Sequence, residues 1–285
     1  PELAGGRLLM LLLRSAPSMA QRVRLAFSRR ARHYDAAASL QRAVAWRLAR
    51  HCRNLPLPAG PMADLGAGTG LLSSALEQQR PGLSLLRLDA CAALLEQDAR
   101  QGRARAGLVS PGASAPQLLW DLNDGLPAGL NRAALLVSSF ALHWLEDPAA
   151  SLRQWCEALA PGGWLGLAVP TAGSFPQWRQ AAAAAGVHCT ALALPERSRL
   201  LAVAAQSLEL RLATTLRFSQ SGPSGRALLR PIGAVGAGST TAAPLGVGAW
   251  RRLESHWPRE SDGHKRLSWE VLLLLGHQPS MELKP

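Results

Sequence analysis

The residues with the clearest chemical potential are an acid and three glycines in the segment Asp64-Leu65-Gly66-Ala67-Gly68-Thr69-Gly70. An apolar stretch precedes the acid and a helical leucine pattern begins at Leu71, so we expect a strand, a glycine-rich turn and a helix. Because glycine has no Cβ and tolerates positive φ, a ligand can lie directly against such a turn. The dinucleotide fingerprint G-x-G-x-x-G would need a glycine at position 71. The turn is therefore predicted to cradle a ligand other than a nicotinamide dinucleotide, with a tight turn that binds nothing as the simpler alternative.

A second acid follows at the spacing that a nucleoside-binding site requires. Asp89 stands nineteen residues after Gly70, at the end of the short apolar run 82–88. A carboxylate at the tip of a strand can accept hydrogen bonds from both hydroxyls of a ribose, so Asp89 is a candidate ribose ligand. Asp121 ends a further apolar run, 116–120, but an acid after a strand is also common in ordinary turns.

The elements that must position these residues alternate between short apolar runs and helical patterns. The first predicted strand ends near residue 64, and the next four cover residues 82–88, 116–120, 133–137 and 164–169. Strands that alternate with helices favour an α/β fold with a parallel sheet wound on both faces. Ligands bind such sheets beyond the carboxyl ends of the strands, which is where the candidate residues and Ser138 fall.

The part of the chain beyond residue 170 has a weaker pattern. Residues 174–185 favour a helix, residues 208–218 alternate like a strand, and the apolar run 269–275 fits a buried final strand. These two strands would complete a doubly wound, mostly parallel seven-stranded sheet. The stretch 230–248 is rich in Gly, Ser, Thr and Ala and is predicted to be a flexible loop.

The amino-terminal region precedes the first strand and divides into two parts. We expect residues 1–18 to be a poorly ordered extension and residues 19–55 to form two amphipathic helices joined near Tyr34. Tyr34 stands among arginines and a histidine, so a lid over the site is the functional interpretation and a solvated helix face with one anchoring aromatic is the alternative. Residues 56–278 are predicted to form one domain, with substrate-covering elements within 170–260.

Composition excludes several classes of protein. The 285-residue chain is 48% hydrophobic and 18% charged, which argues against a wholly disordered chain, and its apolar runs are too short to span a membrane. Four cysteines without a C-x-x-C pair indicate buried thiols in a reducing compartment, so we expect a cytoplasmic protein, and no metal site is predicted. The formal net charge of +12 predicts a polyanionic partner, which could be nucleic acid, an anionic membrane or a strongly acidic protein. A bias in genomic base composition is the alternative explanation.

Several segments, in this order, resemble the malonyl-[acyl-carrier protein] O-methyltransferase family of biotin synthesis, within the class I S-adenosylmethionine-dependent methyltransferases. They are residues 27–34, 64–70, 138–144, 161–163, 173–175, 230–234 and 266–270. The resemblance covers about residues 20–277, and only the first of these segments and residues 230–234 distinguish this family from its superfamily. It implies S-adenosylmethionine as the cofactor and a class I methyltransferase fold with an amino-terminal helical lid.

The resemblance assigns the cofactor site residue by residue. The glycine turn would hold the amino acid end of the cofactor, Asp89 its ribose, and Asp121 the region of its adenine. The implied cofactor-binding residues are Asp64, Gly66, Ala67, Gly68, Gly70, Asp89, Ala90, Asp121, Leu122 and Ser138.

The resemblance also implies a reaction. The family moves a methyl group from S-adenosylmethionine to the free carboxylate of a malonyl thioester, carried by an acyl-carrier protein or coenzyme A, early in biotin synthesis. That carboxylate is already ionised at neutral pH, so no general base is needed and catalysis would rest on in-line placement and exclusion of water. We expect Tyr34 and one of Arg29, Arg30 and Arg230 to hold the carboxylate. An acidic carrier protein would suit the basic chain, which we expect to be a monomer without a stable nucleic-acid or membrane partner.

Two departures from the family pattern keep other acceptors open. Trp269 stands where the family usually has a tyrosine, and the stretch after Ala234 is unusually rich in glycine. Methylation of another small-molecule carboxylate or hydroxyl is therefore an alternative. A nucleic-acid methyltransferase would suit the charge, but the chain lacks both a Pro-Cys pair and an Asn/Asp-Pro-Pro-aromatic run after the fourth predicted strand. An intact glycine turn and Asp89 count against a non-catalytic module with the same fold.

Overall fold

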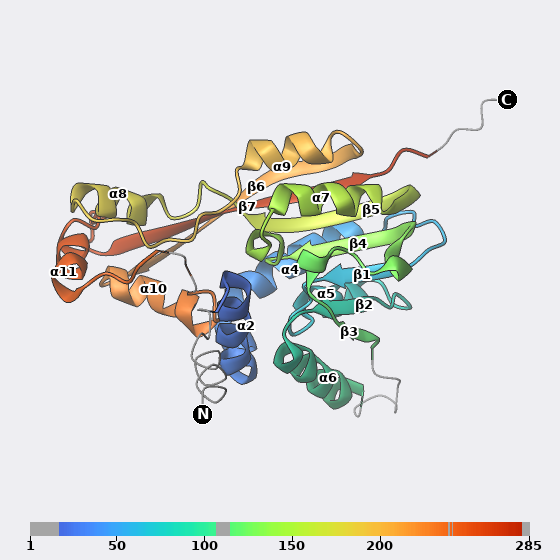
Figure 1. Ribbon diagram of the computed structural model, residues 1–285, viewed down its shortest axis with the longest axis horizontal. Helices are drawn as coiled ribbons and strands as arrows, with labels where there is room; N and C mark the ends of the chain where they lie inside the picture. The colour runs from blue at the N-terminus through green and yellow to red at the C-terminus, as the bar shows by residue number, and fades with distance from the viewer. Residues whose placement is uncertain (1–16, 107–114, 239, 241, 281–285) are drawn as a thin grey trace, which may run out of the picture.

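The computed structural model describes residues 17–106, 115–238, 240 and 242–280, which contain a seven-stranded sheet (Figure 1). The strand order is β3-β2-β1-β4-β5-β7-β6. The strands are β1 (Met62–Leu65), β2 (Leu86–Asp89), β3 (Gln117–Leu119), β4 (Ala133–Ser139), β5 (Leu159–Pro170), β6 (Glu209–Gly222) and β7 (Lys265–His277). The first five pair in parallel, and β7 pairs antiparallel with both β5 and β6. The predicted mostly parallel, seven-stranded sheet is confirmed.

The order of the strands places a crevice beside β1. The chain proceeds from β1 outward to β2 and β3, and then returns to pair β4 with the other side of β1. At such a reversal the loops after the two central strands diverge to opposite faces, which leaves room for a ligand at their carboxyl ends. The glycine turn follows β1 at this point.

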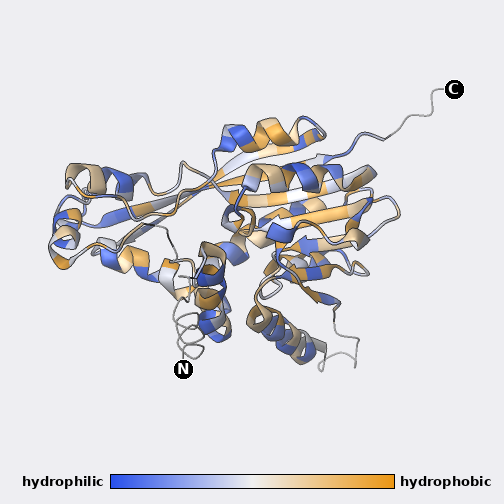
Figure 2. Cartoon of the chain, viewed as in Figure 1, coloured by the Kyte–Doolittle hydropathy of each residue, from blue (hydrophilic) through white to orange (hydrophobic). Residues whose placement is uncertain are grey.

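Helices cover both faces of the sheet. On one face lie α4 (Ser39–Cys52) and α5 (Leu71–Gln79), and on the other lie α7 (Pro148–Glu157) and α9 (Arg197–Ala204). Neighbouring residues of β4 point to opposite faces of the sheet. Leu136 packs in the apolar core beneath α7 and α9, and Leu135 packs in the core beneath α4 and α5. Figure 2 shows hydrophobic colouring along the central strands and both colours on the flanking helices, as a sheet buried on both faces requires.

The antiparallel strand pair β6 and β7 extends beyond the rest of the sheet and carries a second group of helices (Figure 1). These are α8 (Pro176–Ala184), α10 (Gly225–Ala234) and α11 (Val247–Ser255). They enclose a separate apolar cluster that includes Phe175, Leu253 and Trp257. This second lobe lies within the range of the chain predicted to cover the substrate.

The amino-terminal helices are both present, and they pack in different places. α2 (Met19–Arg30) begins with a capping box, in which the Ser18 hydroxyl accepts from Gln21 N at 3.2 Å and the Gln21 side chain accepts from Ser18 N at 2.9 Å. A short helix, α3 (Tyr34–Ala37), follows, and α2 packs against α6 (Ala92–Ala106). α4 instead packs on the sheet beside α5.

Two local predictions were wrong. The stretch predicted as a loop from residue 230 is helical as far as Ala234, because Ser224 caps α10 through Ala227 N at 3.1 Å and Leu228 anchors it in the second core. Residues 161–163, which the predicted strand 164–169 left out, are part of β5. There the absent side chain of Gly163 allows close approach, since a Cβ would lie 2.4 Å from the carbonyl oxygen of Ala133.

No helix within the described residues is both long enough and apolar enough to cross a membrane. The same part of the chain holds no group of three or more His, Cys, Asp or Glu side chains arranged to bind a metal ion.

Candidate active site

The turn between β1 and α5 is built from three glycines with φ of +73° (Gly66), +57° (Gly68) and +72° (Gly70). A Cβ on Gly70 would lie 2.2 Å from Asp98 Oδ1, so a larger residue cannot occupy that position without displacing the Asp98 carboxylate. At Gly68 the nearest atom to such a Cβ would be Leu94 Cδ1 at 3.9 Å. Gly68 therefore presents bare backbone to open space, which is the geometry of a ligand cradle.

The carboxylate of Asp64 lies buried beneath this turn. Its Oδ2 accepts from Ser73 N at 3.1 Å and from Ser73 Oγ at 2.7 Å, while Oδ1 has no hydrogen-bond partner among the described residues. Burial raises the pKa of Asp64 to about 7. A buried carboxylate oxygen without a partner is costly, so Asp64 is suited to a cationic donor from a ligand.

Asp89, at the end of β2, connects the second strand to the same turn. Its Oδ2 accepts from Gly68 N at 2.8 Å and its Oδ1 accepts from Cys91 N at 2.7 Å. Burial raises the pKa of Asp89 to about 6. Each carboxylate oxygen can accept a further hydrogen bond, so the predicted contact with a ribose remains possible with the carboxylate held in this orientation.

A cleft lies above these groups, with an empty volume of about 970 Å³ that includes its open mouth. The predicted cofactor residues that line it are Asp64, Gly66, Ala67, Gly68, Asp89, Ala90, Asp121 and Leu122. Gly70 does not line it, and the buried Ser138 instead donates from Oγ to Leu65 O at 2.7 Å, which joins β4 to β1.

Residues of α2 form the opposite wall of the cleft. Val23, Arg24 and Phe27 face the cavity, and the Arg24 guanidinium lies 3.6 Å from Asp121 Oδ2. Val23 and Ala31 are buried at the spacing of one helical stripe through Phe27, and this leaves Arg30 exposed. The helix thus covers the residues predicted to bind the cofactor, as a lid would.

Asp35 ties the lid to the glycine turn. Its Oδ1 accepts from Thr69 Oγ1 at 2.5 Å and its Oδ2 accepts from Gln101 Nε2 at 2.7 Å. No role was predicted for Asp35. An acid directly after Tyr34, in a tract otherwise dominated by arginine, was the signal in the sequence that could have identified it.

Tyr34 lies in the cleft, whereas none of Arg29, Arg30 and Arg230, one of which was predicted to act with it, lines the cleft. The Tyr34 ring is half-buried beside Phe27, with centroids 6.2 Å apart, and burial, followed by Asp89 and Asp35, raises its pKa. The phenol therefore stays protonated as a hydrogen-bond donor. Arg30 is exposed at the end of α2, and Arg230 is exposed on α10 beside a different hollow.

A second pocket adjoins the cleft and shares Trp144 with it. Its empty volume is about 420 Å³, and its walls come from η4 (Leu142–Trp144) and from the second lobe. His143 Nδ1 and Trp178 Nε1 are buried there without a hydrogen-bond partner among the described residues. Burial lowers the pKa of His143 to about 3, so its imidazole is neutral. The pocket thus combines apolar walls with neutral polar groups that have no hydrogen-bond partner among the described residues.

Aromatic contacts connect segments that are distant in sequence around this second pocket. Phe140 lies 6.4 Å from Trp269, and Phe175 lies 4.4 Å from the same indole, measured between ring centroids. Segments 138–144, 173–175 and 266–270, which carried the resemblance, therefore converge at one place. No role was predicted for His143 or Trp144, although aromatic residues directly after the fourth strand were a visible signal.

Comparison with known proteins places the chain among methyltransferases. Residues 28–197 match a family model described as a methyltransferase domain. The malonyl-[acyl-carrier protein] O-methyltransferase of Methylococcus capsulatus is 32% identical over 77% of this chain and 77% of its own. The protein of the same name from Alcanivorax borkumensis is 29% identical over 87% of this chain and 83% of its own.

The fold also resembles that of solved structures. A putative methyltransferase from Bacillus halodurans superposes with a TM-score of 0.56 at 12% identity, over 82% of this chain and 99% of that one. This likeness supports the fold alone, and the sequence relationship defines the family. The chain belongs to the malonyl-[acyl-carrier protein] O-methyltransferase family and has the class I methyltransferase fold.

Proposed function

We propose that this protein transfers a methyl group from S-adenosylmethionine to the free carboxylate of a malonyl thioester, an early step of biotin synthesis. The observation that carries the proposal is the pair of adjoining pockets that share Trp144. One contains the residues predicted for the cofactor, and the other is apolar with unpaired neutral polar groups. Family membership supports the same reaction, since relatives named for it align over most of this chain.

The residues of the cleft fit S-adenosylmethionine. The unpartnered Asp64 Oδ1 suits the ammonium of the cofactor, and Asp89 keeps acceptor capacity for ribose hydroxyls. The open space at Gly68 suits close contact with backbone, and Asp121 and Leu122 would border the adenine. When bound, the cofactor supplies a methyl group attached to a positively charged sulfur, which makes the methyl carbon electrophilic.

The aromatic pocket would hold the acceptor. A malonyl carboxylate is ionised at neutral pH, so one of its oxygens can form the new bond to the methyl carbon without losing a proton, and the chain needs no general base. The chain instead has to place the carboxylate and exclude water. Trp178 is a neutral donor, and the neutral His143 can donate from Nδ1 in the tautomer that carries its proton there. Both can therefore orient an acceptor without cancelling the charge of the nucleophile.

Tyr34 and the arginines have different standing in this proposal. Tyr34 lines the cofactor cleft and stays protonated, so it can donate a hydrogen bond to the carboxylate. Arg29, Arg30 and Arg230 remain the candidates for the predicted arginine that holds the carboxylate. Each would have to reach the acceptor from outside both pockets, because all three are exposed and line neither.

Incubation with isotopically labelled S-adenosylmethionine and a panel of acceptors tests the proposal. The panel contains malonyl-acyl-carrier protein, malonyl-coenzyme A, free malonate and RNA. We expect label on the two thioesters and none on RNA. Label on RNA alone, or on a different small carboxylic acid in preference to the thioesters, would contradict the proposed acceptor while leaving the methyltransferase family unaffected.

A further inference from the structure

A basic groove runs along α10 and α11, outside both pockets. It consists of two adjoining hollows that share Arg226, Val247 and Trp250, with empty volumes of about 1420 and 920 Å³ that include open solvent. Arg230 lines one hollow, and Arg251 lines the other. Of the residues of this groove, the reaction proposed above gives a role only to Arg230.

The groove carries positive charge that the protein itself does not neutralise. Arg226, Arg230 and Arg251 are exposed, and so is Arg259 at the far end of the groove. Within the part of the chain that the structure describes, these four guanidinium groups form no ion pair. Like charges gathered on one surface repel one another, so their arrangement favours a negatively charged partner.

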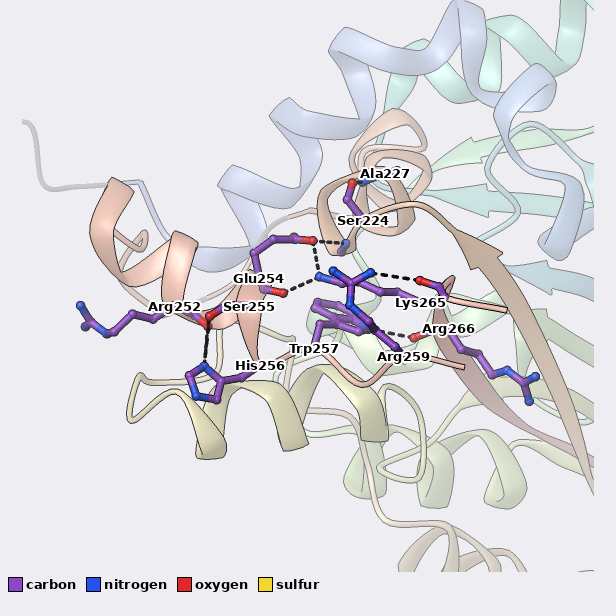
Figure 3. A network of polar contacts seen from close by, with 12 residues as sticks. Ser224, Ala227, Arg252, Glu254, Ser255, His256, Trp257, Arg259, Lys265 and Arg266 are labelled. Atoms are coloured by element: carbon purple, nitrogen blue, oxygen red, sulfur yellow. Dashed lines mark hydrogen bonds and ion pairs between the residues drawn. The ribbon is translucent and has the colours of Figure 1, made fainter. Parts of the chain in front are cut away.

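The acid in the groove is already engaged beneath this surface. Figure 3 shows Glu254 reaching from α11 toward Lys265 and toward the start of α10. Glu254 Oε1 accepts from Gly225 N at 3.0 Å and pairs with the buried ammonium of Lys265. Trp257 Nε1 donates to Arg266 O at 3.0 Å, which fixes the end of α11 to β7. Glu254 thus holds α10 and α11 together, whereas the arginines that line the groove remain exposed.

Apolar surface accompanies the charge. The Val247 side chain is 72% exposed, and Trp250 and Leu229 are half-buried in the same groove. An exposed valine beside an indole and several arginines matches the composition of protein interfaces, where aromatic residues and arginine are enriched. A purely ionic ligand would have no use for this apolar strip.

One helix connects the groove to the aromatic pocket. Arg226 and Arg230 of α10 line the groove, and Ile232 of the same helix lines the pocket. At a rise of about 1.5 Å per residue, Arg226 and Ile232 are about 9 Å apart along the helix axis. A partner bound in the groove would therefore stand beside the route into the pocket that we assign to the acceptor.

We propose that the basic groove is the docking surface for an acidic carrier protein, which delivers its thioester arm past α10 into the aromatic pocket. This inference rests on the proposed function, because it assumes that the aromatic pocket receives a thioester. The arginines steer the acidic protein and fix its orientation, and Val247 and Trp250 supply the apolar contact. Coenzyme A carries no protein surface and does not use the apolar part of this interface.

The test compares two double variants with equal charge changes. Arg226→Glu with Arg251→Glu alters the groove, and Arg47→Glu with Arg50→Glu alters exposed arginines of α4 as the control. Titration calorimetry with unloaded acyl-carrier protein measures docking without any reaction. We expect the dissociation constant to be at least tenfold higher for the groove variant and within twofold of wild type for the control. Added salt should weaken the binding of the wild type.

Kinetics separate this inference from the proposed function. For the groove variant we expect KM for malonyl-acyl-carrier protein to rise about tenfold, while kcat/KM for malonyl-coenzyme A stays within twofold of wild type. Equal carrier-protein binding by both variants, or an equal loss with both substrates, would overturn the docking assignment. If the wild type methylated neither thioester, the proposed function would fail, and calorimetry would still decide whether the groove binds the carrier protein.

Discussion

The ring of Phe27 meets the indole of Trp144 edge-on, with centroids 5.7 Å apart and an interplanar angle of 88°. Phe27 belongs to the lid helix α2, and Trp144 stands between the cofactor cleft and the aromatic pocket. Edge-on aromatic pairs contribute about 0.5–1.5 kcal/mol beyond their buried area. The position of the lid is therefore energetically coupled to the wall between the two pockets.

Phe27→Ala removes the ring contact between the lid helix and Trp144. We predict that kcat/KM for malonyl-coenzyme A falls about tenfold and that S-adenosylhomocysteine binding weakens, because Phe27 contacts the wall of both sites. Leu25→Ala is the matched control, since Leu25 lies on the same helix and is 51% exposed. Steady-state kinetics and calorimetry on both variants provide the comparison. Equal behaviour of the two variants would show that the contact does not couple lid and site.

Asp64 should make the stability of the cofactor-free protein depend on pH. Burial raises its pKa to about 7, above the usual value near about 4. Between those values the folded protein binds more protons than the unfolded chain, so the stability linked to this group is present at low pH and lost as pH rises toward 7. We predict that the free energy of unfolding falls less between about pH 5 and pH 8 in Asp64→Asn than in wild type.

Denaturant unfolding at several pH values measures this difference. Asp89, whose pKa burial raises to about 6, acts in the same direction, so the pH dependence is expected to be reduced and not abolished. Asp124→Asn, at an exposed position, should leave the wild-type dependence intact. A wild-type slope in Asp64→Asn would contradict the assignment of a raised pKa to this carboxyl.

His143 should act as a neutral donor and not as an acid or base. Burial lowers its pKa to about 3, so its charge does not change between about pH 6 and pH 8. We predict that His143→Phe lowers kcat/KM about tenfold without changing cofactor affinity, and that His143→Gln restores most of the loss because it keeps a neutral donor. If His143→Gln were as impaired as His143→Phe, the imidazole would serve packing and not acceptor orientation.

Tyr34→Phe should separate catalysis from cofactor binding. Removing the hydroxyl deletes a donor to the carboxylate but keeps the ring contact with Phe27. We predict near-normal S-adenosylhomocysteine binding and at least about a tenfold loss of kcat/KM, equivalent to about 1.4 kcal/mol. Arg30→Ala, measured beside it, tests the predicted role of an arginine that the structure places on the surface. Loss of cofactor affinity together with melting temperature in Tyr34→Phe would instead mark a packing role.

Local sequence signals were sufficient to bring the glycine turn and Asp89 into one predicted site. The glycine turn and Asp89 depend on neighbouring residues and on a fixed strand–helix spacing, so their positions could be predicted before the fold was known. Gly68 N and Asp89 Oδ2 are indeed joined by a hydrogen bond of 2.8 Å. The exposure of Arg30 was also available from the helical period, because Val23 and Ala31 occupy the buried stripe.

Long-range packing explains what could not be predicted. The aromatic pocket joins His143, Trp178, Ile232 and Trp269, which no short segment contains. The helix α10 forms despite Pro231 because its Leu228 is anchored in the second core, and propensity alone favours a loop there. Contacts of this kind depend on how the antiparallel strands β6 and β7 position the second lobe. The local sequence pattern does not specify that position.

Mass spectrometry of malonyl-acyl-carrier protein after incubation with S-adenosylmethionine carrying a labelled methyl group tests the central claim most directly. We predict one labelled methyl group per malonyl chain, located on the distal carboxyl as an ester, and slower labelling when Asp89→Ala is used. Label on the protein part of the carrier, label on a carbon of the malonyl chain, or the absence of any label would contradict methyl transfer to the malonyl carboxylate.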